Sequence, residues 1–309
     1  MTPVLAVDSA IATAMTFDLL LTMASRQRGL PRREARMLLG GATGRSQEWL
    51  VAHGLEIADS TVTDRFLELV ERRAQGEPMA YLTGVREFYG RPFAVSPAVL
   101  IPRPETELLV DVALELLNDV RSPCLLDLGT GTGILAVSLA LERPDATVFA
   151  SDLSPHALDV AGGNAAALGA DRIVFLGGDW WQALDSDRCQ GPGENERAFD
   201  LVVANPPYVA ADDRHLAQGD LRFEPELALV GGPDGLAALR RIIAGAPSRL
   251  GRSAWLAVEH GLEQGASCRQ LMVESGFERV VTRRDLEHRD RVTIGQMNRD
   301  RTKHRREPG

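Results

Sequence analysis

Residues 124–142 read CLLDLGTGTGILAVSLALE, and this stretch decides the fold. It begins with a short apolar run, continues through glycines at positions 129, 131 and 133, and ends in an apolar segment with helical spacing. Glycines at every second position let the backbone turn tightly and let a ligand approach main-chain atoms that a side chain would cover. The stretch therefore predicts a buried strand, a ligand-binding loop and a helix.

The same alternation of apolar runs and helical stretches continues to the end of the chain. Further runs occupy 147–152, 172–179, 200–207 and 253–261, and two final runs at 278–285 and 290–297 are close enough to pair as antiparallel strands. Such alternation predicts an α/β fold, with a Rossmann-like, mostly parallel sheet of seven strands covered by helices on both faces. Ligands of these sheets bind beyond the carboxyl ends of the strands.

The first part of the chain has a different pattern, with helical spacing and no convincing alternating strand. One predicted helix has apolar residues at 62, 66, 69 and 70 behind a Thr61-x-x-Asp64 sequence that is typical of a capping box. We predict four segments: an N-terminal helical-bundle domain at 1–84, a β-hairpin linker at 85–101, the α/β domain at 102–297 and a disordered basic tail at 298–309.

Composition narrows the class of protein. The chain has 309 residues, 44% of them hydrophobic, and no apolar run approaches the roughly 20 residues of a membrane span. The N-terminus lacks the basic start of a secretory signal, so we expect a cytoplasmic protein without membrane contact. A net charge of −9 argues against direct binding of nucleic acid. The three cysteines are far apart, which suggests neither disulfides nor a metal site.

The glycine loop predicts a particular kind of cofactor. Gly129, Thr130, Gly131, Thr132 and Gly133 do not form a dinucleotide fingerprint, because position 134 is isoleucine where that motif needs glycine. No Gly-Lys-Ser/Thr follows, so the loop is not a phosphate loop either. A nucleoside without pyrophosphate fits this pattern, and S-adenosyl-L-methionine is the obvious candidate.

Acidic and aromatic residues follow the next two predicted strands. Asp152, about 20 residues beyond the loop, is placed to accept hydrogen bonds from ribose hydroxyls; its alternative role is a helix N-cap, although Ser154 could cap instead. Asp179 and Trp180 could bind the amine and the face of an adenine, and Trp180 could equally be an ordinary core residue.

The fourth predicted strand ends in Asn205, Pro206, Pro207 and Tyr208. A plain turn would explain the stop, but proline has no N–H, so this rim presents carbonyl acceptors without competing donors. Asn205 Oδ1 and the Pro206 carbonyl could accept the two hydrogens of a substrate NH2 group, while Tyr208 stacks on the planar group that carries it. The predicted chemistry is transfer of a methyl group from a sulfonium to this nitrogen, mainly by positioning.

Taken together, the motifs LIPRPETELLV (100–110), LDLGTGTG (126–133), NPPYV (205–209) and EHGLEQG (259–265) resemble the peptide chain release factor glutamine methyltransferases. The resemblance implies a class I methyltransferase fold and methylation of glutamine N5 in the Gly-Gly-Gln motif of class I release factors. It also implies an N-terminal domain that helps to recognise the release factor. By this resemblance the glycine loop, Asp152 and Trp180 bind S-adenosyl-L-methionine, and Asn205 to Tyr208 hold the glutamine. We also predict cofactor contacts for Asp179 and Asn205.

Other functions fit parts of the pattern. NPPY also occurs in methyltransferases of adenine N6, where a flipped base presents the same NH2 geometry. A sister enzyme methylates glutamine in a ribosomal protein, but GTGTG, PRPETE and EHG favour the release factor enzyme. A binding module with an inactive cofactor site would be expected to have lost the glycine loop or NPPY, and both are intact. His260 is expected to order a local turn, and Arg103 either lies near the cofactor or supports a helix entry.

Overall fold

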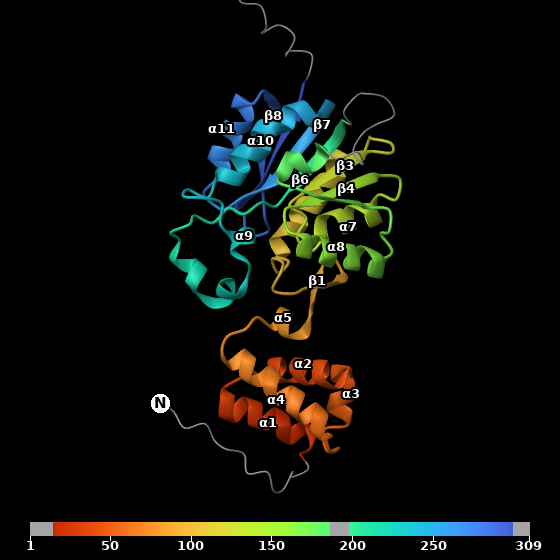
Figure 1. The fold of residues 1–309 in the computed structure, drawn as a ribbon, viewed down its shortest axis with the longest axis vertical. Helices are drawn as coiled ribbons and strands as arrows, with labels where there is room; N and C mark the ends of the chain where they lie inside the picture. Colours follow the sequence, from red (N-terminus) through yellow and green to blue (C-terminus); the bar gives the residue numbers. More distant parts are fainter. Residues whose placement is uncertain (1–14, 186–197, 299–309) are drawn as a thin grey trace, which may run out of the picture. The chain divides into compact units, whose positions relative to one another are not determined.

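The computed structural model describes residues 15–185 and 198–298, and the chain divides into two compact units at Gly84 and Val85 (Figure 1). The tail predicted at 298–309 lies, apart from Asn298, outside the described residues. None of the helices within these ranges combines the length and the apolar character needed to cross a membrane.

The first unit is helical, and its helices are α1 (Phe17–Arg28), α2 (Arg32–Thr43), α3 (Gln47–Ala52), α4 (Ser60–Ala74) and α5 (Met79–Thr83). Apolar residues at helical spacing face one common core, in which Leu20, Leu38, Leu50 and Phe66 are fully buried. The unit therefore has a hydrophobic core of its own, as a separate domain requires.

Helix α4 begins at a different cap from the predicted one. The Asp59 side chain accepts a hydrogen bond from the Val62 amide at 2.9 Å, and the Asp59 backbone is extended (φ −67°, ψ 163°), as an N-cap requires. Thr61 lies inside the first turn, so the predicted Thr61-x-x-Asp64 cap is wrong. An aspartate two residues earlier already satisfies the exposed amide of the first turn.

The second unit opens with the predicted hairpin, formed by β1 (Val85–Phe88) and β2 (Arg91–Ala94). Both turn residues, Tyr89 and Gly90, have positive φ (51° and 69°), as a two-residue turn of type I′ requires. Phe88 and Phe93 on the two strands are buried in the core of the second unit. The hairpin thus packs as part of that unit.

The second unit is built on a seven-stranded sheet in the order β5-β4-β3-β6-β7-β9-β8, which confirms the predicted fold class. Its strands are β3 (Cys124–Leu128), β4 (Thr147–Asp152), β5 (Val174–Gly177), β6 (Phe199–Ala204), β7 (Leu250–Glu259), β8 (Phe277–Arg284) and β9 (Asp290–Met297). The last run is antiparallel and inserts between β7 and β8. The strand order reverses between β3 and β6, and ligands of such sheets bind at this switch point.

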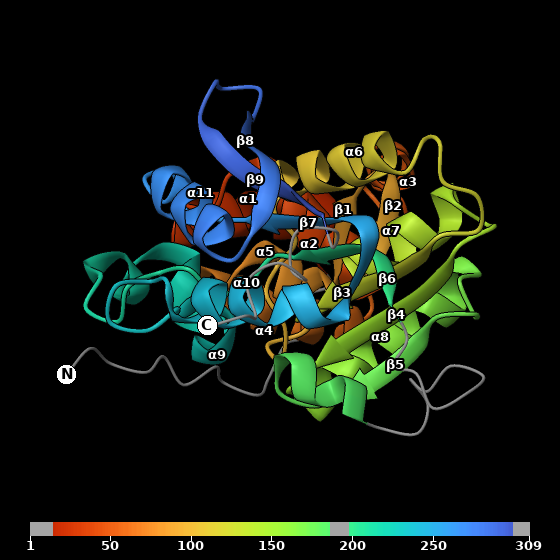
Figure 2. The ribbon, with the colours of Figure 1, turned by 90° about the horizontal axis from the view of Figure 1, so that it is seen from above.

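Helices cover both faces of the sheet (Figure 2). One face carries α6 (Glu107–Leu116), α7 (Ile134–Glu142) and α8 (Pro155–Leu168), and the other carries α10 (Ala237–Arg249) and α11 (Gly265–Glu274). Successive residues of each strand contribute to opposite cores: Leu125 packs with the first group of helices and Leu126 with the second. This two-sided burial explains why the strands read as continuous apolar runs.

Candidate active site

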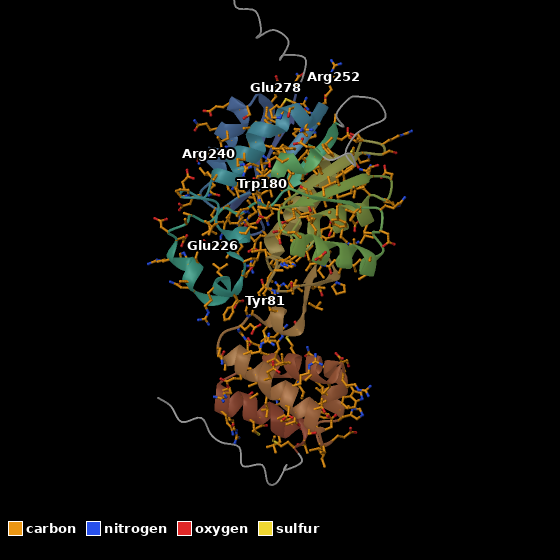
Figure 3. The ribbon with its side chains drawn as sticks, in the orientation of Figure 1. Tyr81, Trp180, Glu226, Arg240, Arg252 and Glu278 are labelled. Carbon is orange, nitrogen blue, oxygen red and sulfur yellow. The ribbon has the colours of Figure 1, made fainter. Side chains whose placement is uncertain are left out.

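A cavity of about 360 Å³ lies at the carboxyl ends of β3, β4 and β6. Figure 3 shows Trp180 toward this end of the second unit, whereas Arg252 and Glu278 lie at the opposite end of the sheet. Residues that the sequence predicted for the site and that line this cavity are Gly129, Thr130, Gly131, Thr132, Asp152, Asp179, Trp180, Asn205 and Pro207.

Hydrogen bonds from β4 hold the glycine loop in place. The amides of Gly129 and Thr130 both donate to the Ser151 carbonyl at 2.9 Å, and the Gly131 amide donates to Asp152 Oδ2 at 2.9 Å. Gly129 has a φ of 75°, and a Cβ atom at this position would lie 3.1 Å from the Trp180 ring. The loop therefore needs glycine here both for its backbone conformation and for the close approach of the indole.

Gly133 has a different environment from the rest of the loop. It is outside the cavity lining, precedes α7 with a φ of 83°, and a Cβ atom there would lie 3.1 Å from Ala161 of α8. The sequence predicted a cofactor contact at this position; the structure instead gives Gly133 a role in the close packing of α7 against α8.

Asp127, which was not predicted from the sequence, holds the glycine loop through hydrogen bonds from the end of β3. Its side chain is buried, and Oδ2 accepts hydrogen bonds from Thr130 Oγ1 at 2.7 Å and from the Ala136 amide at 3.2 Å. Burial raises the pKa of Asp127 to about 7, while these two hydrogen bonds favour the charged form. The carboxyl group thus joins the glycine loop to the first turn of α7.

Asp152 presents a carboxylate to the cavity from the end of β4. Its two oxygens accept hydrogen bonds from the amides of Gly131 and Ser154, each at 2.9 Å. Ser154, not Asp152, is the N-cap of α8, since its side chain accepts from the Ala157 amide. Burial raises the pKa of Asp152, and the lone pairs that remain suit hydroxyl donors.

Asp179 and Trp180 follow β5 at the next position around the cavity. Asp179 Oδ2 accepts a hydrogen bond from Arg241 of α10 at 2.7 Å, so a cation neutralises this acid. Trp180 has a left-handed backbone (φ 49°) and packs partly against the core beside α10. The indole therefore has both roles that the sequence left open, since it lines the cavity and belongs to the core edge.

The NPPY segment is split between cavity and interior. Asn205 Nδ2 donates to Thr106 Oγ1 at 3.1 Å, which leaves Asn205 Oδ1 available to the cavity. Pro207 also lines the cavity, whereas Pro206 is buried and Tyr208 lies outside the lining. The Tyr208 hydroxyl donates to Glu259 Oε1 at 3.4 Å, and burial raises the pKa of that hydroxyl.

Arg103 lines the cavity, which is one of the two roles predicted for it, and its partner Glu224 escaped the sequence analysis. Glu224 has a fully buried side chain that pairs with Arg103 and accepts from the Ile101 amide at 3.1 Å. This pair connects the PRPET segment to the loop before α9 (Glu226–Leu229), and both segments line the cavity. The motifs mark these segments, but nothing in one sequence pairs residues that lie 121 positions apart.

His260 orders its surroundings, as the sequence analysis expected. It is fully buried, and its ring nitrogens lie 2.8 Å from the Gly261 carbonyl and from Thr293 Oγ1. Burial lowers the pKa of His260, which favours the neutral ring. Within the described ranges, no group of three or more His, Cys, Asp or Glu side chains is arranged to hold a metal ion.

Comparison with known proteins places this architecture in a family. Residues 21–84 match the family described as PrmC N-terminal domain, and residues 105–220 match the one described as Methyltransferase small domain. The release factor glutamine methyltransferase of Bordetella pertussis is 50% identical over 271 residues, covering 87% of this chain and 96% of that protein. The chain belongs to the release factor glutamine methyltransferase family.

Other members of the release factor glutamine methyltransferase family are similar over the same length. The Escherichia coli K12 protein is 43% identical over 266 residues, which is 86% of this chain and 92% of that protein. Among solved structures, the hMettl16 catalytic domain in complex with MAT2A 3'UTR hairpin 1 is 16% identical and covers 79% of this chain and 83% of its own. Its TM-score of 0.52 supports the shared fold alone.

Proposed function

We propose that this methyltransferase transfers the methyl group of S-adenosyl-L-methionine to the side-chain amide nitrogen, N5, of the glutamine in the Gly-Gly-Gln motif of class I peptide chain release factors. The names of its relatives supply the release factor and the glutamine. The observation that carries the proposal is the orientation of Asn205, whose amide nitrogen is engaged by Thr106 while its oxygen is available to the cavity beside the glycine loop.

The cavity residues fit the cofactor. Gly129 leaves space beneath the Trp180 ring, Asp152 offers acceptors for ribose hydroxyls, and Asp179 keeps one oxygen for an adenine amine while Arg241 holds the other. A volume of about 360 Å³ lies within the range of small-molecule sites. When bound, the cofactor supplies a methyl group on a positively charged sulfur and leaves as S-adenosyl-L-homocysteine.

The chain's own part in the reaction is to position the amide. Asn205 Oδ1 and the Pro206 carbonyl accept the two N–H groups, so the nitrogen lone pair is directed at the methyl group. As the nitrogen–methyl bond forms, the carbon–sulfur bond breaks with its electron pair left on sulfur, and positive charge moves toward the nitrogen, so its N–H groups become stronger donors to the same acceptors. One of these protons then leaves the nitrogen for solvent, which gives the neutral N-methyl amide. Tyr208 lies outside the cavity lining and is held at its hydroxyl by Glu259 and at its carbonyl by Gln264 (3.0 Å); the stacking of its ring on the planar amide stays a prediction.

Two further points remain predictions. The first unit is proposed to contribute to release factor recognition, which its match to the PrmC N-terminal domain supports. A cytoplasmic location and the absence of direct nucleic acid binding are expected from the sequence and from a substrate that acts in translation.

The test uses methyl-labelled S-adenosyl-L-methionine with a purified release factor, and a second release factor in which the motif glutamine is replaced. Mass spectrometry maps the label. We expect label on the motif glutamine only, and a loss of about 10²-fold or more in rate for Asn205→Ala, because an acceptor that strengthens in the transition state is removed. Asn118→Ala, at an exposed asparagine just after α6, is the control and should keep the wild-type rate.

The alternatives predict different products. Label on a ribosomal protein, or on adenine in nucleic acid, with none on the release factor, would retain the cofactor site and overturn the proposed substrate. Calorimetric titration of the wild-type enzyme with S-adenosyl-L-homocysteine tests cofactor binding by itself, because binding is expected whichever substrate receives the label.

A further inference from the structure

Gln264 occupies the start of a helix but does not cap it. It is the N-cap residue of α11, where its backbone is helical (φ −91°, ψ −6°) and its side chain forms no capping hydrogen bond. Ser, Thr, Asp and Asn are preferred at this position because their short side chains can reach the free amides of the first turn. The Gln264 side chain extends instead toward the turn before α11 and toward NPPY, and these contacts explain why the residue is glutamine.

Three hydrogen bonds determine the orientation of this side chain. The Gly261 amide donates to Gln264 Oε1 at 2.9 Å, which identifies the oxygen end of the side-chain amide. Nε2 then faces two acceptors, the Tyr208 carbonyl at 3.0 Å and the Gly235 carbonyl at 3.3 Å. A glutamine side chain has one acceptor oxygen and two donor hydrogens, and this arrangement uses all of them.

The turn that carries Gln264 is itself fixed to the sheet. The Gln264 amide donates to the Gly261 carbonyl at 3.0 Å, which closes the turn at 261–264. His260 Nδ1 lies 2.8 Å from the same carbonyl, and its Nε2 lies 2.8 Å from Thr293 Oγ1 on β9. The His260 amide also donates to a β9 carbonyl at 3.0 Å. The paired strands β7 and β9 therefore determine where the Gln264 side chain begins.

Backbone atoms of the loop after α9 come close to the Tyr208 carbonyl. A Cβ atom at Gly235 would lie 2.3 Å from the Tyr208 oxygen, and one at Gly231 would lie 2.5 Å from the Pro207 oxygen. These separations are too short for any side chain, so both positions need glycine. The end of NPPY is thus packed against a loop that lines the cavity as well as against Gln264.

NPPY is held near both of its ends. At its start, Asn205 follows β6 and donates from Nδ2 to Thr106 Oγ1 at 3.1 Å. The two proline rings fix φ at both middle positions, so rotation about ψ and at Tyr208 is the main freedom left. The hydrogen bond from Gln264 to the Tyr208 carbonyl restrains that rotation. The Pro206 carbonyl, which is proposed to accept from the substrate, lies within this restrained segment.

We propose that Gln264 is a positioning residue for methyl transfer: it fixes the Tyr208 carbonyl, and through it holds the Pro206 carbonyl and the Tyr208 ring where the substrate amide is bound. The inference rests on the proposed function, because it assumes that this amide binds at NPPY. Gln264 lies outside the cavity lining, so it acts through NPPY and not by contact with a ligand. Supporting hydrogen bonds of this kind hold in place the residues that meet a substrate.

The decisive experiment separates the two ends of the Gln264 side chain in the full-length enzyme. Gln264→Glu keeps an oxygen for the Gly261 amide but removes both donors, whereas Gln264→Leu removes the whole side-chain amide at similar volume. Gln270→Glu and Gln270→Leu are the matched controls, because Gln270 is exposed on α11 and hydrogen-bonds to Glu274 at 2.8 Å. At saturating cofactor and release factor we expect kcat to fall about 10²-fold in both Gln264 variants, as for a small misplacement near a reacting group. Both controls should keep the wild-type kcat.

The two Gln264 variants distinguish positioning of NPPY from closure of the turn. If Gln264 only closed the turn, Gln264→Glu would keep its bond to the Gly261 amide and the wild-type rate, and Gln264→Leu alone would be slow. Binding of S-adenosyl-L-homocysteine, measured by calorimetric titration, should be unchanged in all four variants, since neither Gln264 nor Gln270 lines the cavity. Circular dichroism verifies that each variant is folded.

A second readout does not depend on turnover. The chain has three tyrosines, and Tyr208 is the one that precedes a valine. Labelling with carbonyl-carbon-13 tyrosine and nitrogen-15 valine therefore marks a single peptide bond, between Tyr208 and Val209. The carbonyl signal of this bond should shift in Gln264→Glu and in Gln264→Leu, because the carbonyl loses its hydrogen bond from Nε2. It should stay at the wild-type position in both Gln270 variants.

The outcomes separate this inference from the proposed function. If the wild type methylates the release factor and Gln264→Glu matches Gln270→Glu in rate, the inference is overturned while the proposed function stands. If no release factor is methylated, the proposed function fails, and the carbonyl signal then decides the inference by itself. An unchanged Tyr208 signal in Gln264→Glu would show that Gln264 does not hold NPPY.

Discussion

At the scale of the single residue, Gly129 shapes the part of the cavity that is proposed to hold the cofactor. This residue combines a φ of 75° with the ring of Trp180 3.1 Å from where a Cβ would lie. An L-residue pays about 1–2 kcal/mol for a left-handed backbone, and the ring must shift as well. We therefore expect Gly129→Ala to weaken S-adenosyl-L-homocysteine binding by about tenfold or more, because 1.4 kcal/mol corresponds to a factor of ten. Calorimetric titration measures the change.

Gly162→Ala is the matched control for this prediction. Gly162 lies inside α8 with a helical backbone and open space around its Cβ position. Alanine there should leave binding unchanged and stabilise the fold by up to about 1 kcal/mol, since alanine favours helix over glycine. Equal affinities for the two variants would refute a special role for Gly129.

Single residues also show how far the site could be predicted from sequence. Asp152 and Asn205 were predicted because each stands at the end of an apolar run, and parallel strands bring such positions together at one edge. Thr106 and Glu259 were missed because they act through partners that are distant in sequence: Thr106 lies 99 positions from Asn205, and Glu259 lies 51 from Tyr208. Only the folded chain reveals hydrogen bonds of this kind.

At the scale of the element, the start of α4 gives a direct test of capping. Asp59 is the side chain that accepts from the Val62 amide, whereas Thr61 lies one position inside the helix. Asp59→Ala should lower the free energy of unfolding of the first unit by about 1 kcal/mol, while Thr61→Ala should change it much less. Hydrogen exchange of the α4 amides in the full chain measures both. If Thr61→Ala lowered the free energy of unfolding more than Asp59→Ala, the cap predicted from the sequence at Thr61 would be correct.

The other helices and strands could be predicted from the sequence where a local pattern of residues determines them. Buried strands such as β3 and β6 read as apolar runs, and the Tyr89-Gly90 turn marks the hairpin. The insertion of β9 between β7 and β8 is different, because it depends on pairing between Leu256 and Gly295, which no local pattern encodes. Helical spacing predicted the position of α4, but the sequence did not show that Asp59 rather than Thr61 caps it; the backbone conformation of Asp59 decides this.

At the scale of the whole molecule, two separate cores define two units that can be altered independently. The first unit exposes apolar residues on the segment from α3 to residue 57, with Val51, Leu55 and Ile57 at 64%, 85% and 64% exposure. Three exposed apolar residues in one short segment make it a candidate surface for binding another protein. None of them contributes to the core of the first unit, so polar replacements should leave that core intact.

If the first unit recognises the release factor, the double substitution Leu55→Ser, Ile57→Ser should impair methylation of the intact protein but not of a short peptide that contains Gly-Gly-Gln. We expect kcat/KM for the intact release factor to fall about tenfold or more, since truncation of buried interface anchors commonly costs more than 1 kcal/mol each. Leu286→Ser in the second unit, at a leucine that is 101% exposed, is the matched control and should behave as wild type. An equal loss on peptide and protein would point to damage at the active site, and no loss on either would exclude this surface from recognition. Only the selective loss is consistent with a first unit that binds the substrate and a second unit that carries out the chemistry.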